Sequence, residues 1–107
     1  MNVRTKGHQF ERDMVIKLKP IFPDVSTSRS QNRSLDDRGV DLVNTGNFRI
    51  QCKAVEKLGN IHTIIDYMDS KMLDDEYGMN IVFHKRNRQG IIVSMRYEDF
   101  IDLIKNN

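Results

Sequence analysis

The sequence predicts an α/β domain in which a mixed central sheet is flanked by helices. In three segments apolar residues recur at three- and four-residue spacing, as on a helix face, and short alternating or wholly apolar runs between them are typical of strands. With 107 residues, 38% hydrophobic and 30% charged, the composition is that of one globular domain spanning residues 1–107.

The first helix is expected over residues 6–21, where the apolar residues share one face. Thr5 is the candidate N-cap, and Pro23 ends the segment. Glu11 follows the apolar residue Phe10 and therefore lies beside the buried stripe rather than opposite it.

Strands are expected after this helix. A weak strand over 24–28 runs into a long polar loop that ends near Arg38. A β-hairpin then pairs 40–43 with 48–54 across the turn 44–47.

The second half predicts a helix over 61–76, strands over 79–84 and 91–95, and a closing helix over 97–104. The last helix is expected to turn three large apolar side chains inward, those of Phe100, Leu103 and Ile104. The order is therefore helix, three strands, helix, two strands, helix.

The formal net charge of +2 hides an uneven distribution. Basic residues gather between 29 and 57, whereas acidic residues gather between 66 and 76, on the outer side of the second helix. A basic face opposite an acidic one is therefore expected, and a basic face suits a polyanionic partner.

Cys52 is the only cysteine, so the chain cannot form an internal disulfide or a multi-cysteine zinc site, and a reducing compartment fits best. The predominantly polar residues 1–6 lack the apolar core of a signal peptide, and no apolar run approaches the roughly 18 residues that span a bilayer. A cytoplasmic protein without membrane association is expected.

One constellation of residues carries chemistry. In the predicted hairpin, alternation places Arg49, Gln51 and Lys53 on one face of the second strand, and Asp41 lies on the partner strand. Phosphodiester hydrolysis requires oxygen ligands for Mg²⁺ and a cation that stabilises developing negative charge. Asp41 offers an anionic ligand, Gln51 a neutral carbonyl ligand, and Lys53 the cation.

Three stretches of the chain resemble the PD-(D/E)XK nuclease superfamily, in particular its small Holliday-junction resolvase-like and phage-type endonucleases. They are Lys6-Gly7-His8-Gln9-Phe10-Glu11, Gly39-Val40-Asp41-Leu42-Val43 and Ile50-Gln51-Cys52-Lys53. The order of elements also agrees, so the resemblance spans nearly the whole chain. It implies a restriction-endonuclease-like α-β-β-β-α-β-β-α core.

The resemblance also implies roles for individual residues. Asp41 would be the central metal ligand and Lys53 the catalytic cation, while Glu11 would be a further carboxylate toward the metal. The backbone carbonyl of Cys52 would complete the ligand set, with Gln51 beside it. The implied cofactor is Mg²⁺ or Mn²⁺, and the implied activity is hydrolysis of DNA, including branched DNA, by a homodimer.

The sequence departs from the family pattern at two positions. Val40 stands where proline is common, at little chemical cost. Gln51 replaces the usual acidic residue, which removes one negative charge from the metal site and makes Glu11 more important.

Four basic residues are the candidates for contacts with DNA. They are Arg29, Arg33, Arg49 and Lys57. Arg29 and Arg33 belong to the polar segment before the hairpin, whose residue types are those that contact phosphate groups.

Alternatives to the nuclease hypothesis remain open. Asp41 could form a structural ion pair with Lys53 or Arg49, Glu11 could be an ordinary helix-surface residue, and Gln51 and Lys53 could face solvent on an edge strand. At the level of function, the rivals are a DNA-binding module that has lost catalysis and a protein-interaction domain that uses the acidic helix.

Overall fold

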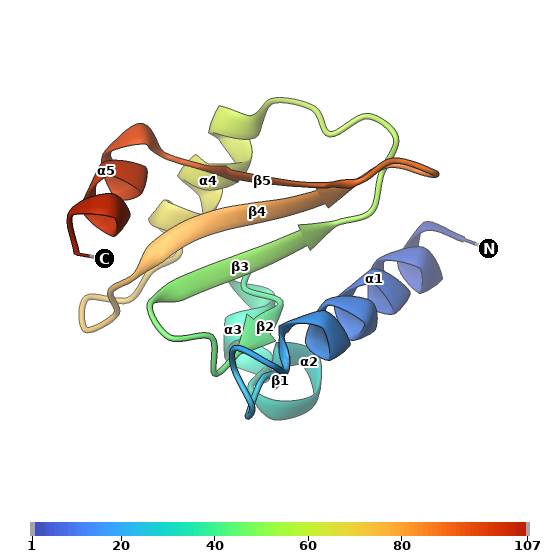
Figure 1. The fold of residues 1–107 in the computed structure, drawn as a ribbon, viewed down its shortest axis with the longest axis horizontal. Coiled ribbons are helices and arrows are strands. Elements are labelled where there is room, and N and C mark those ends of the chain that lie inside the picture. Colours follow the sequence, from blue (N-terminus) through green and yellow to red (C-terminus); the bar gives the residue numbers. More distant parts are fainter. Residues whose placement is uncertain (1, 107) are drawn as a thin grey trace.

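A three-stranded mixed sheet lies at the centre of the computed structural model, which describes residues 2–106 (Figure 1). Its middle strand, β4 (Met79–Lys85), pairs in parallel with β3 (Phe48–Lys53) and antiparallel with β5 (Ile91–Met95). β4 is an almost continuous apolar run because both of its faces are covered. The α/β class and the mixed sheet expected from the sequence are confirmed.

Two helices cover opposite faces of this sheet. α1 (Val3–Leu18) packs Phe10 and Met14 into a cluster that includes residues of β3 and β4. α4 (Ile61–Ser70) contributes its buried residues to a second cluster that contains Val82 of β4. Since Val82 and its β4 neighbours point to alternate sides, the two helices sandwich the sheet.

The boundaries of α1 differ from the expected 6–21. Asn2 rather than Thr5 caps the helix: the side-chain oxygen of Asn2 accepts a hydrogen bond of 2.8 Å from the backbone N–H of Thr5. The prediction of Thr5 was wrong because Asn2, three residues earlier, already supplies the acceptor. The helix ends at Leu18, whose carbonyl accepts from both Ile21 and Phe22 in a tight turn before the proline.

The expected β-hairpin is also corrected. β2 (Leu42–Val43) pairs antiparallel with β1 (Ser26–Thr27) and forms a separate two-stranded sheet. The residue before β2, Asp41, joins this segment to β3: its N–H donates to the carbonyl of Ile50 at 2.7 Å. The N–H of Cys52, two residues further along β3, donates to the carboxylate of Asp41 rather than to a backbone carbonyl. The backbone pairing of this segment with β3 therefore does not continue.

Two short helices replace most of the expected polar loop. α2 (Ser28–Gln31) and α3 (Arg33–Asp37) follow β1 and lie beside β2 (Figure 1). Asn32 separates them, and its side chain accepts from the N–H of Leu35 at 3.2 Å. Apart from these two helices, the order of elements is helix, three strands, helix, two strands, helix.

α4 ends six residues earlier than the expected 61–76. Beyond Ser70 the chain turns, and the side chain of Glu76 accepts a hydrogen bond of 2.8 Å from the N–H of Leu73. This contact satisfies a backbone donor outside the helix and fixes a non-helical approach to β4. Over residues 2–106, no helix has both the length and the apolar character needed to cross a bilayer.

The final helix, α5 (Tyr97–Lys105), does not turn its apolar side chains inward as expected. Phe100, Leu103 and Ile104 are all exposed. The prediction was wrong because α5 lies at one end of the sheet, beyond β5, where no other element formed by residues 2–106 lies over its outer face (Figure 1).

Gly78 generates a prediction for stability. Its φ of 134° is unfavourable for other residues, and an added Cβ would lie 2.7 Å from the carbonyl oxygen of Asn47. We expect Gly78→Ala to lower the free energy of unfolding by about 1–3 kcal/mol in urea denaturation. The control is Gly90→Ala, where an added Cβ meets no atom of the described residues within 4 Å. Equal stability of the two variants would contradict the assigned backbone conformation.

Candidate active site

Asp41 is fixed by three hydrogen bonds where the two sheets meet. Its N–H donates to Ile50 of β3, and its carbonyl accepts from the N–H of Ser28 at 2.8 Å. Its side-chain oxygen Oδ2 accepts from the N–H of Cys52 at 2.8 Å. Asp41 is thereby held against the free edge of β3 by contacts with Ile50 and Cys52, the two neighbours of Gln51.

Glu11 of α1 brings a second carboxylate near Asp41. Glu11 is only 7% exposed, because it lies beside Phe10 on the side of the helix that packs against the sheet. Arg29 of α2 lies 3.4 Å from Glu11, measured from Nε to Oε1. Glu11 is therefore a buried, partly paired carboxylate and not a helix-surface residue.

Burial and mutual repulsion perturb both carboxylates. The pKa of Asp41 is raised to about 7, mainly by burial and also by the nearby charges of Glu11 and Asp36, whereas the hydrogen bond from Cys52 and the charge of Lys53 oppose the rise. Burial also raises the pKa of Glu11, while Arg29 opposes the shift. The site gathers negative charge without full compensation, which is the condition that a bound cation relieves.

Gln51 and Lys53 are half-buried on the neighbouring strand. The amide of Gln51 lies over Gly39, since a Cβ added to Gly39 would be 3.1 Å from Nε2 of Gln51. Lys53 is near enough for its charge to lower the pKa of Asp41, although within residues 2–106 the two form no ion pair. A structural ion pair of Asp41 with Lys53 is thus not formed.

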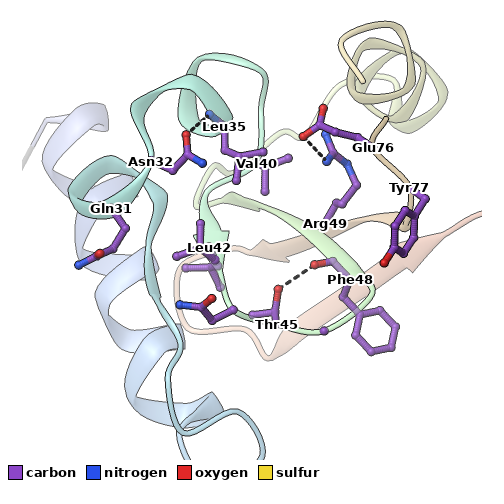
Figure 2. Close-up of a pocket in the computed structure, with 13 residues that line it drawn as sticks. Gln31, Asn32, Leu35, Val40, Leu42, Thr45, Phe48, Arg49, Glu76 and Tyr77 are labelled. Atoms are coloured by element: carbon purple, nitrogen blue, oxygen red, sulfur yellow. Dashed lines mark hydrogen bonds and ion pairs between the residues drawn. The ribbon is translucent and has the colours of Figure 1, made fainter. Parts of the chain in front are cut away.

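Arg49 shares a face of β3 with Gln51 and Lys53, the face opposite the side chains of Ile50 and Cys52, but its guanidinium is bound in contacts of its own. It is 7% exposed, and its guanidinium contacts Asn80 at 2.9 Å. Figure 2 shows its second contact, with Glu76 at 3.3 Å. Arg38 reaches the same Glu76 oxygen at 2.7 Å. The expected contact of Arg49 with DNA is corrected, because this side chain belongs to a buried polar network on the α4 side of the sheet.

A cavity of about 500 Å³ borders this network, and its lining includes neither Asp41 nor Glu11. Val40 and Leu42 line it together with Arg49, Glu76 and Tyr77, as Figure 2 shows. Among the described residues Asp41 is not part of the lining, although both of its chain neighbours are. The candidate site around Asp41 and Glu11 therefore lies outside this cavity.

The remaining predicted residues lie as follows. Arg33 and Lys57 are exposed, and the side chain of Arg29 is about one-third exposed beside Glu11. Cys52 packs its side chain into the core, and burial together with the charge of Asp41 raises the pKa of its thiol. Cys52 is thus a core residue and a poor nucleophile.

Sequence reasoning gave too little weight to two residues. Ser28 is fully buried; its hydroxyl donates to the carbonyl of Val40 and lies 3.3 Å from Oδ1 of Asp36. Asp36 is the third carboxylate whose charge acts on both Asp41 and Glu11. Its position five residues before Asp41 was a visible signal, but only the turn after α3 brings its charge near the pair.

The donor set fits a divalent cation with incomplete protein ligation. Within residues 2–106, no three or more histidine, cysteine, aspartate or glutamate side chains are grouped closely enough to hold a metal ion by themselves. Two repelling carboxylates, an amide oxygen and water are nevertheless ligands that Mg²⁺ accepts, since it usually binds one or two carboxylates and keeps several waters.

Comparison with known proteins does not identify a family. No protein-family model, no curated protein and no solved structure matches this chain. Its function must therefore be argued from the site itself.

The raised pKa of Asp41 predicts a pH dependence of stability. Between the ordinary value of 3.8 and about 7, native Asp41 retains a proton that the unfolded chain has lost. The native state then binds more protons, so the free energy of unfolding falls as the pH rises through this window. In chelator, we expect Asp41→Asn to make this decline smaller in urea denaturation.

The matched control for this experiment is Asp74→Asn, which alters an exposed carboxylate. It should leave the decline as it is in the unaltered protein. An Asp41→Asn protein with the same pH dependence as the unaltered protein would show that Asp41 titrates normally.

Proposed function

We propose that the protein is a metal-dependent endonuclease that hydrolyses phosphodiester bonds of DNA. The observation that carries the proposal is the pair of nearby carboxylates, buried Glu11 and partly buried Asp41, beside the strand that bears Gln51 and Lys53. Further support comes from the order of elements along the chain, which apart from α2 and α3 is the expected one, although β2 pairs with β1 and not with β3.

The proposed roles follow from chemistry. Asp41, Glu11 and the amide oxygen of Gln51 would hold Mg²⁺ or Mn²⁺, with the Cys52 carbonyl as a further candidate ligand. When bound, the ion supplies a Lewis acid that neutralises the phosphate and lowers the pKa of water. Lys53 would stabilise the negative charge that develops on the phosphate oxygens.

Burial of these residues matters for such a reaction. Interactions between charges strengthen where water is excluded, so one ammonium group contributes more to the transition state here than on an open surface. The neutral Gln51 reduces the negative charge toward the metal, and the nearby charge of Asp36 offsets part of this loss.

Branched DNA is the substrate class that the resemblance of the sequence suggests. Arg29, Arg33 and Lys57 remain the candidates for contact with phosphates, since all three retain exposure. Arg29 adjoins the carboxylate pair and is the candidate nearest to the cleaved bond.

Cleavage assays test the proposal. Four-way junction, duplex and single-stranded DNA are incubated with Mg²⁺, Mn²⁺ or chelator. We expect cleavage that requires metal and that falls by about 100-fold or more in Asp41→Asn and in Lys53→Met, as when a charge-stabilising group is removed. Lys17→Met makes the same charge change on the exposed side of α1 and should cleave normally.

Two outcomes would contradict the proposal. Cleavage that persists in both site variants would belong to a contaminating enzyme. DNA retention without any cleavage, with or without metal, would instead identify a binding module that lacks catalysis.

DNA binding gives a second, independent prediction. In chelator, Arg33→Ala and Lys57→Ala should each weaken binding equally for all sequences and reduce the slope of log K against log salt by about 1. Lys17→Ala serves as the control. Binding that is absent at low salt, or insensitive to salt, would favour a protein-interaction domain.

A further inference from the structure

The buried polar network of Arg38, Arg49 and Glu76 carries more positive charge than its own ion pairs neutralise. Both arginines pair with the single carboxylate of Glu76, at 2.7 and 3.3 Å. Within residues 2–106 neither arginine forms an ion pair with any other acidic side chain. Two guanidinium groups and one carboxylate therefore bring one excess positive charge to a place where each side chain is less than one-fifth exposed.

Two donors of this network have no hydrogen-bond partner among the described residues. They are Nε of Arg38 and Nη2 of Arg49, and both atoms are buried. Asp69 approaches the network only through the amide of Asn80, at 2.6 Å, and is itself paired with Arg96. Because a buried charged donor without a partner is costly, an oxygen acceptor that reached Nη2 of Arg49 would stabilise the network.

The cavity of about 500 Å³ that Arg49 lines is the place from which such an acceptor can come. Figure 2 shows Arg49 and Glu76 on one side of this cavity, and Leu35, Val40 and Leu42 on the other. The volume lies within the range of small-molecule sites, about 300–1,000 Å³. A ligand in this cavity thus has room for a compact organic body as well as one charged group.

Aromatic side chains at the cavity suit an apolar body. Phe48 and Tyr77 line it, and Tyr77 is 80% exposed, so its ring is open to a ligand. Three uncharged amide side chains also belong to the lining, those of Gln31, Asn32 and Asn44. The only acidic side chain among the described lining residues is Glu76, which two arginines already share.

We propose that this cavity binds a small organic anion. Its carboxylate or phosphate oxygen accepts a hydrogen bond from Arg49, and its apolar body packs against Phe48 and Tyr77. An oxyanion answers both observations, because it supplies the missing negative charge and accepts from guanidinium N–H groups. The proposal does not depend on the nuclease function, since neither Asp41 nor Glu11 lines this cavity.

An NMR titration of the full chain with benzoate, phenyl phosphate and benzamide tests the site. Benzamide has nearly the shape of benzoate but carries no charge. We expect both anions to shift the backbone amide signals of residues 42–48 and 76–77. Benzoate should bind about ten-fold more tightly than benzamide, as expected of a hydrogen bond to a charged group. The anion that binds more tightly identifies the preferred oxyanion.

Two variants change the charge of the network in opposite directions. Arg49→Gln should weaken benzoate binding by about ten-fold or more, since it removes the donor together with its charge. Glu76→Gln nearly keeps the shape of the side chain and removes its negative charge, so benzoate should bind about five-fold more tightly. Arg86→Gln is the control, because Arg86 is exposed beyond the end of β4 that lies farthest from Phe48.

Circular dichroism establishes that each variant folds. If Arg49→Gln does not fold, the gain of affinity expected of Glu76→Gln still tests the proposal. Three results would overturn it. They are the absence of any shift at the cavity with either anion, equal affinities for benzoate and benzamide, and a benzoate affinity that Glu76→Gln leaves at the value of the Arg86→Gln control.

Discussion

The hydrogen bond from the N–H of Cys52 to the carboxylate of Asp41 is the interaction on which the rest of the site depends. It stands where a backbone contact would have continued a hairpin, while β2 pairs with β1. α2 and α3 follow β1, and Ser28 ties them to the chain around Asp41. The hydrogen bond from Cys52 thus fixes the position of the carboxylate relative to β3.

The same contact has an electrostatic consequence. A carboxylate fixed at a buried strand edge loses solvation, and Glu11 of α1 adds a second negative charge nearby. Arg29 compensates only part of this charge, through one contact of 3.4 Å to Glu11. Buried charges are costly unless they are paired, so the site favours either a retained proton or a bound cation. This balance links the packing of α1 on the sheet to the proposed metal chemistry.

Much of the fold could be predicted because the spacing of apolar residues along the sequence indicates which side chains are buried. Phe10 and Met14 of α1, and the run from Ile81 to Phe83 in β4, carry their location in their spacing. Asp41, Gln51 and Lys53 could be brought together because they are close in sequence and alternate along a strand. Glu11 was named on the resemblance alone.

The partners of Arg49 could not be predicted, since Glu76 and Asn80 lie about thirty residues away and only tertiary packing joins them. The exposure of α5 was missed for a related reason: apolar spacing shows which side chains share a face of the helix, but not whether the fold places another element against that face.

Anomalous diffraction from a crystal soaked in Mn²⁺ would test the central claim most directly. The account predicts one strong peak in contact with carboxylate oxygens of both Asp41 and Glu11, with Arg29 displaced from Glu11. Manganese found elsewhere on the surface, or a carboxylate pair that keeps its present contacts at saturating Mn²⁺, would contradict it.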